Sequence, residues 1–294
     1  MLNQVVSILF PILGLALVGL CIGHFIKPDF RPINRLNIDA FVPALVFSSL
    51  VVMPLDIEQI PLLTASLFAV LIPALLMLPI CYFFKLNYKV WTPPQMFRNS
   101  GNLAIPLFTY AFGETAIAPA VLLFVMSSCL HFSVGLALIS KGNPLLQVAR
   151  MPIFLSAALA LTLNLVGIGV WEPLYNATSL LGQAAIPIML VSLGAQMCNI
   201  KMSGLKTGLW CTGLSILTGG IAFLFIYLLI PLSTLHLQMM LLFAMFPPAV
   251  MNYMFAERFD LAPEKVASMV LFSNFLCIIT LPIMLTVALS FSET

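Results

Sequence analysis

The chain has 294 residues, of which 62% are hydrophobic and only 7% are charged. A soluble domain carries about 25% charged residues, so this composition excludes a soluble globular protein and indicates an integral membrane protein. The formal net charge is +2 and the basic residues are scattered in short loops, which excludes a basic surface for nucleic acid.

Apolar segments long enough to cross a bilayer follow one another along the chain. A helical span needs about 20 mostly apolar residues. The N-terminal segment lacks the basic residues and the cleavage site of a signal peptide, so it is interpreted as the first span. The sequence predicts an all-α protein with ten spans, at 4–26, 34–53, 61–84, 95–112, 117–140, 151–170, 178–199, 207–230, 236–256 and 264–290.

The charged residues of the loops predict the orientation. Lys and Arg collect on the cytoplasmic side of membrane proteins. If both termini are periplasmic, the cytoplasmic loops hold every basic residue: Lys27, Arg31, Arg35, Lys85, Lys89, Arg98, Lys141, Arg150, Lys201, Lys206, Arg258 and Lys265. The opposite side holds acidic residues and no basic ones: Asp56, Glu58, Glu114, Glu172 and Glu293. A miscounted span would scramble this segregation, which favours ten spans.

The two halves of the chain resemble each other weakly. Pro43 in the second span matches Pro187 in the seventh, and I-A-P at 117–119 matches L-A-P at 261–263. Five spans is an odd number, so the second half would be inverted relative to the first. Inverted repeats are typical of secondary transporters. We therefore expect two five-helix repeats, 1–140 and 141–294.

Two predicted spans combine a proline with an asparagine. Asn102 lies four residues before Pro106, and Pro248 lies four residues before Asn252. Proline removes a helical hydrogen bond, and bare backbone groups cannot face lipid. We therefore predict that the fourth and ninth helices are broken where they cross. The predicted breaks lie at one glycine and three prolines: Gly101, Pro106, Pro247 and Pro248.

Each break would leave helix ends near the membrane centre. A helix N-terminus carries about half a positive elementary charge, so it can hold an anion without a basic side chain. The two asparagines add amide donors and acceptors at the same depth. The predicted substrate site combines them with apolar and hydroxyl neighbours: Asn102, Asn252, Ile105, Val250, Met251, Ser48 and Ser192.

Titratable residues are rare in the predicted spans. Arg98 begins the fourth span on the cytoplasmic side, where its guanidinium either steers anions or, as we expect, snorkels to the surface. His131 lies deep in the fifth span, either as a proton relay or as a neutral packed histidine. The chain has neither a zinc motif nor a Gly-rich phosphate loop, so we expect no metal, no cofactor and no ATP hydrolysis.

The two broken segments are similar to a known family. R-N-S-G-N-L-A-I-P followed by F-G-E, and F-P-P-A-V-M-N-Y followed by A-E-R-F, resemble the auxin efflux carrier family, which is related to the bile acid–sodium symporters. The resemblance implies inverted repeats whose broken helices cross at Pro106 and Pro248, with Asn102 and Asn252 on the substrate. The short loop between the fifth and sixth spans differs from that of the plant carriers and favours a bacterial inner-membrane protein.

The sequence thus predicts a transporter of a small organic anion, such as a dicarboxylate or an auxin-like acid, driven by a secondary gradient or by the membrane potential. Spans 3–5 and 8–10 would form a transport core, and spans 1–2 and 6–7 a scaffold that contacts lipid and offers a homodimer surface. An anion channel and a proton-coupled symporter that uses His131 stay open as alternatives. An intramembrane hydrolase with a Ser127–His131 pair is disfavoured because nothing would form an oxyanion hole, so we predict no enzyme activity.

Overall fold

The computed structural model describes residues 2–53, 59–139, 151–200 and 202–291, and within these ranges every regular element is a helix. The predicted all-helical class is therefore confirmed. Six helical segments in these ranges are long and apolar enough to cross a membrane: Asn3–Ile26, Gln59–Phe83, Glu114–Ile139, Glu172–Asn199, Met202–Leu229 and Pro263–Ser290. Their number and hydropathy identify a multi-pass membrane protein.

The helices of the first half begin with α1 and end with α8. In chain order they are α1 (Leu2–Cys21), η1 (Ile22–Ile26), α2 (Arg31–Leu36), η2 (Asn37–Phe41), α3 (Val42–Val51), α4 (Gln59–Phe83), α5 (Tyr88–Met96), η3 (Ser100–Ala104), α6 (Ile105–Phe112), η4 (Glu114–Ala116), α7 (Ile117–Leu130), η5 (His131–Gly135) and α8 (Leu136–Ile139).

The second half continues with α10 and ends with the longest helix of the chain. These helices are α10 (Pro152–Val166), α11 (Glu172–Gln183), α12 (Ala185–Gln196), η6 (Met197–Asn199), η7 (Met202–Gly204), α13 (Leu205–Leu229), α14 (Thr234–Met245), α15 (Met251–Arg258) and α16 (Pro263–Ser290).

Helix occupies each of the ten predicted ranges, but four of them lie outside the six long apolar segments. The ranges 34–53 and 151–170 contain α3 and α10, and α10 ends at Gly167, whose left-handed φ of 73° stops the helix. The ranges 95–112 and 236–256 each contain two helices separated by extended backbone. The predicted repeat boundary at 140/141 and several charges used for the orientation lie outside the described residues: Asp56, Glu58, Lys141, Arg150, Lys201 and Glu293.

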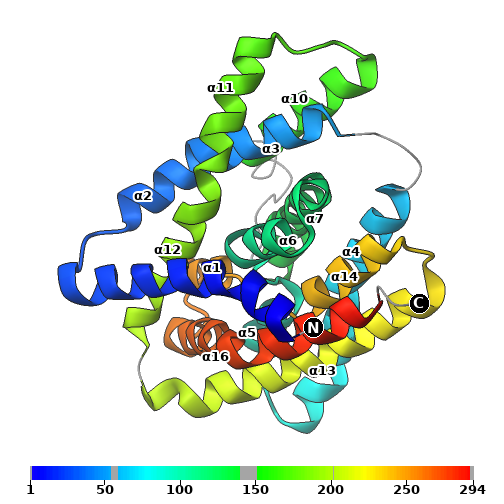
Figure 1. Ribbon diagram of the computed structural model, residues 1–294. Coiled ribbons are helices and arrows are strands. Elements are labelled where there is room, and N and C mark those ends of the chain that lie inside the picture. Colours follow the sequence, from blue (N-terminus) through cyan, green and yellow to red (C-terminus); the bar gives the residue numbers. More distant parts are fainter. Residues whose placement is uncertain (1, 54–58, 140–150, 201, 292–294) are drawn as a thin grey trace.

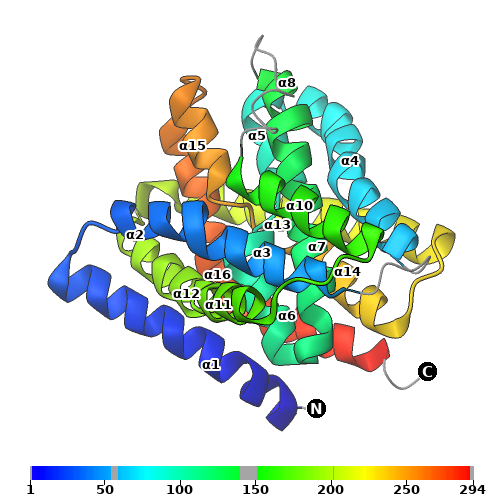
Figure 2. The same ribbon diagram turned by 90° about the horizontal axis from the view of Figure 1, so that it is seen from above.

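Close helix contacts join the two halves of the chain. The first helix, α1, packs on α12, and α3 packs on α10 (Figures 1 and 2). A Cβ on Gly194 of α12 would overlap the carbonyl oxygen of Ala16 in α1, and a Cβ on Gly19 would overlap that of Val191. Small residues at such contacts let helix backbones approach closely in a membrane.

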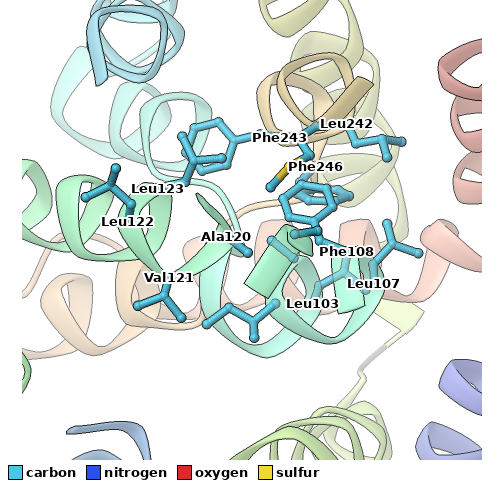
Figure 3. Packing of buried hydrophobic residues seen from close by; sticks show 14 of the residues in the cluster. Leu103, Leu107, Phe108, Ala120, Val121, Leu122, Leu123, Leu242, Phe243 and Phe246 are labelled. Atoms are coloured by element: carbon cyan, nitrogen blue, oxygen red, sulfur yellow. The ribbon is translucent and has the colours of Figure 1, made fainter. Parts of the chain in front are cut away.

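A large apolar cluster packs behind the two interrupted helices. Figure 3 shows Leu107 and Phe108 of α6 against Leu123 of α7 and Phe243 and Phe246 at the end of α14. The rings of Phe108 and Phe246 have centroids 5.7 Å apart, and both residues are fully buried. This packing holds the halves of the interrupted helices in place beside the fifth predicted span.

Candidate functional site

The two interrupted helices meet at their breaks. Residues 97–99 separate α5 from η3, and residues 246–250 separate α14 from α15. The two stretches pair as a short antiparallel bridge between Arg98 and Pro248. The Asn99 N–H donates to the Pro247 carbonyl at 2.8 Å, and the Ala249 N–H donates to the Phe97 carbonyl at 2.9 Å. Backbone groups that each helix loses at its break are thus satisfied by the other helix.

The first break differs in position from the prediction. The chain is extended at Phe97–Asn99, and η3 and α6 then run without interruption through Gly101 and Pro106. Pro106 lies at the start of α6, directly after the widened turn of η3, where a proline is tolerated in a first helical turn. The second break does contain Pro247 and Pro248.

Three asparagine amides fix the geometry of the breaks. The Asn252 amide donates to the carbonyls of Phe97 and Ala249, both at 2.9 Å. The Asn274 amide, from α16, donates to the Pro248 carbonyl at 3.0 Å, and its oxygen accepts from the Asn99 amide at 2.7 Å. All three side chains are buried. They satisfy carbonyl groups that the extended backbone leaves exposed to an apolar interior.

Arg98 corrects a second prediction, because its side chain does not snorkel to the surface. The residue is only 1% exposed. Its guanidinium donates to the Phe246 carbonyl at 3.3 Å, the Ser215 carbonyl at 3.3 Å and the Thr218 hydroxyl at 3.2 Å. Among the described residues no carboxylate forms an ion pair with it. A fixed positive charge therefore lies inside the protein beside the crossing, held by neutral oxygens from α13 and the second break.

A cavity of about 1500 Å³ leads to the crossing. Its mouth is lined by the exposed charged residues Arg31, Arg35, Glu257 and Lys265, at the ends of α2, α15 and α16. Its depth is lined by one buried charged residue, by polar residues and by residues at the starts of η3 and α15: Arg98, Asn99, Ser100, Gly101, Asn102, Ser127, Ser128, His131, Val250 and Met251. The cavity exceeds the usual 300–1,000 Å³ of a small-molecule site, so it has room for a ligand together with water.

The predicted substrate residues fall into three positions. Asn102, Val250 and Met251 line the large cavity. Asn252 lies behind them in a separate small cavity, with its amide committed to the break. A third group is buried outside both linings: Ile105, Ser48, whose hydroxyl donates to the Leu45 carbonyl of its own helix, and Ser192.

His131 lies between the two cavities and lines both. Its ring stacks on Phe97 at 4.0 Å between centroids and meets the edge of Phe255 at 4.8 Å. Its Nε2 is buried and has no hydrogen-bond partner among the described residues. The same holds for the side-chain oxygen of Asn252, the polar group next to it. The predicted hydrogen-bonded, packed histidine is therefore packed but incompletely hydrogen-bonded.

Sequence reasoning missed Arg98 and Asn99 as residues of the crossing. Asn99 and Arg98 stand inside the R-N-S-G-N motif, so their presence in a polar run within a span was the available signal. Asn274 lies in α16 and reaches the break only in the folded chain. A buried amide in a membrane helix costs free energy unless it is hydrogen-bonded, and this cost is the signal in the sequence that points to Asn274.

We expect Asn252→Leu to lower the melting temperature of the purified protein by several degrees. It removes two buried hydrogen bonds to carbonyls of the breaks, each worth about 1 kcal/mol. Asn102→Ala is the matched control, because Asn102 is half-buried in the cavity wall. Equal melting temperatures for the two variants, measured in the same detergent, would contradict the structural role given to Asn252.

Comparison with known proteins agrees with a transporter. Residues 142–285 match the family described as "Membrane transport protein". An "Uncharacterized transporter" of Methanothermobacter thermautotrophicus is 25% identical over 299 aligned positions, which cover 91% of this chain and 94% of that protein. The family match lies in the second half of the chain, and the alignment with the relative extends over both halves. Together they confirm the resemblance carried by the two broken segments. The chain belongs to the auxin efflux carrier family of membrane transport proteins.

Proposed function

We propose that the protein is a secondary transporter of a small organic anion that binds at the crossing of the broken helices and is exposed alternately to the two sides of the membrane. The observation that carries this proposal is the large cavity that leads from exposed charged residues to the crossing. A cavity that opens to one side and ends at mid-chain breaks is the geometry of a transporter in one of its two states.

The deep part of the cavity suits an anion. The starts of η3 and α15 both contribute to its wall, through Ser100 and Gly101 and through Val250 and Met251. Two helix N-termini that converge on one space favour negative charge there. Asn102 adds an amide, and the fixed charge of Arg98 lies just behind the same backbone. Carboxylates are therefore the proposed substrate class, with dicarboxylates and auxin-like acids as the first candidates.

The helix pairing supports two inverted five-helix repeats. The contact of α1 with α12 joins the first predicted span to the seventh, and the contact of α10 with α3 joins the sixth to the second. In the predicted repeat the first span corresponds to the sixth and the second to the seventh. The symmetry that relates the two halves therefore maps the α1–α12 pair onto the α10–α3 pair. The antiparallel pairing of the two breaks has the same symmetry. We propose that the spans of these pairs form the scaffold, and that α4 to α8 with α13 to α16 form the transport core.

The charges around the cavity mouth support the predicted orientation. Arg31, Arg35 and Lys265 lie at the mouth, on the side where the sequence places the basic loops. In Figure 2 the start of α1 and the end of α16 lie together, away from α2 and α15. We propose an inner-membrane protein with periplasmic termini whose cavity opens to the cytoplasm. The homodimer through the scaffold stays a prediction, which a measurement of molecular mass in detergent would test.

A ligand screen followed by counterflow tests the proposed function. Purified protein would be heated with malonate, succinate, malate or indole-3-acetate, because a ligand of the folded state raises the melting temperature. The acid with the largest shift would then be radiolabelled and used in proteoliposomes. A carrier exchanges labelled for unlabelled substrate and saturates. Flux without saturation or exchange would instead indicate a channel.

Asn102→Ala is expected to reduce this counterflow at least tenfold while the protein stays folded. The amide lines the cavity beside the start of η3, and loss of one hydrogen bond to a charged ligand costs about 1.5–3 kcal/mol. Thr109→Ala is the control in the same segment, because the Thr109 hydroxyl donates to the Ile105 carbonyl of its own helix. Normal counterflow by Asn102→Ala would remove this residue from the binding site.

A further inference from the structure

His131 is the one residue, among those described, that lines both the large cavity and the small one behind it. The small cavity has a volume of about 10 Å³, close to the space that one water molecule needs. Its lining extends from the exposed Lys89 of α5 to the buried His131 and Asn252. It therefore connects the imidazole with the surface near the start of α5, by a route separate from the large cavity.

Two residues that line this small space each have a buried polar atom without a hydrogen bond of standard geometry among the described residues. The atoms are Nε2 of His131 and the side-chain oxygen of Asn252, and the two side chains lie close enough to interact. A buried polar atom without a partner is costly, and native structures keep such atoms mainly where they serve a function. One water molecule in the small cavity would reach both atoms and would bring a proton to Nε2.

We propose that His131 binds a proton that is transported together with the organic anion, and that this proton enters through the small cavity past Lys89. The proposal rests on the anion transport proposed above and names its coupling ion. The proton adds to the Nε2 lone pair of neutral imidazole and leaves from the same atom after transport, so no other reactant is consumed.

The surroundings of His131 explain why proton and anion would bind together. Phe97 and Phe255 cover the ring. The charged side chains beside it are both positive: Lys89 in the small cavity and Arg98 next to Phe97. No carboxylate appears in the lining of the small cavity. A carboxylate bound in the large cavity would supply the missing negative charge.

Apart from the buried Arg98, the charged groups that line the large cavity are exposed side chains toward its mouth. They are Arg31, Arg35, Asp39, Glu257, Glu264 and Lys265, together with the phenol of Tyr253. The mouth is thus close to balanced in charge, and the bound anion is the group that changes the field at His131. By linkage, protonation raises the affinity for the anion by the same factor by which the anion raises the affinity for the proton.

The test measures proton flux and substrate flux in the same proteoliposomes. The probe is radiolabelled malonate, or indole-3-acetate if the screen favours it, and a pH-sensitive dye is trapped inside. Wild type is expected to accumulate the acid when the outside is made acidic, with acidification of the lumen that requires the acid. His131→Gln is expected to lose at least 90% of the accumulation driven by the pH gradient. Its counterflow, which needs no net proton movement, is expected to persist but to need a higher substrate concentration for half-saturation, because the linkage between proton and anion is lost.

Two further variants separate a proton carrier from a packing residue. Ser133→Ala, on the same turn, is the control, since its hydroxyl donates to the Cys129 carbonyl of its own helix. Lys89→Gln removes a positive charge from the small cavity and should move the pH profile of transport to higher pH, because the imidazolium becomes easier to form. An unmoved profile would count against the proposed route.

The outcomes separate this inference from the proposed function. Net uptake of the acid by wild type without lumen acidification, or undiminished pH-driven accumulation by His131→Gln, would overturn the inference and leave anion transport standing. Absence of counterflow with every acid of the screen would overturn both. The dye measurement on wild type decides the matter even if His131→Gln does not fold.

Discussion

Arg98→Met is expected to destabilise the protein more than any other single side-chain change at the crossing. The guanidinium satisfies the carbonyls of Phe246 and Ser215 and the hydroxyl of Thr218. A buried acceptor that loses its donor costs about 1–3 kcal/mol, and methionine fills the space without replacing any donor. We expect a fall in melting temperature of ten degrees or more, or loss of monodisperse protein.

The control for this change is Arg35→Met. Arg35 forms an exposed ion pair with Asp39 at 3.4 Å, and such pairs contribute about 0–1 kcal/mol. Both substitutions remove one positive charge and introduce the same side chain. Equal melting temperatures of Arg98→Met and Arg35→Met would show that the carbonyls of the break find other partners. Arg98 would then not be needed to stabilise the crossing.

Chemical rescue distinguishes charge from packing at this position. Arg98→Ala leaves a space lined by the same oxygens, and free guanidinium at millimolar concentration should enter it and raise the melting temperature with saturation. Urea has a similar planar shape without the charge and is the matched control. Equal rescue by both would mean that the shape of the group, rather than its charge, holds the break.

Much of the helical arrangement could be predicted because hydropathy is a local property. Helix occupies each of the ten predicted ranges, and six segments are long enough to span a membrane on their own. The second break could also be located, since Pro247 and Pro248 remove two adjacent N–H groups from the ladder. In these cases the residues that determine the structure are neighbours in the sequence.

The first break could not be located in this way. Residues 97–99 contain no proline, and their extended backbone depends on partners far along the chain: Pro247 and Asn274. Pro106, which carried the prediction, begins a helix that continues from η3. Tertiary hydrogen bonds thus determine the position of the first break. Pro106 determines only where a helical turn can begin.

The candidate site was partly predictable for a related reason. Asn102, Val250 and Met251 line the large cavity because they adjoin the two breaks, which the motifs had marked. Ser48 and Ser192 were chosen by depth alone, and depth does not fix the direction in which a helix turns its side chain. Ser48 bonds to its own helix instead.

Gly194→Ala is expected to disturb the contact between α1 and α12. The new Cβ would overlap the carbonyl oxygen of Ala16, which belongs to the backbone of α1 and cannot rotate away. Overpacking of a buried contact costs about 1–3 kcal/mol, and here α1 and α12 must move apart as whole helices. We expect a fall in melting temperature of several degrees and a smaller yield of folded protein from membranes.

Gly14→Ala provides the matched control, because no heavy atom lies within 4 Å of the position that its Cβ would take. Both changes add one methyl group to a membrane helix, so a general effect of alanine would appear equally in the two variants. A fall confined to Gly194→Ala would mean that α1 is held by close backbone packing. Equal melting temperatures would mean that α1 tolerates displacement from α12, and the scaffold would then be a loose support for the crossing rather than a rigid one.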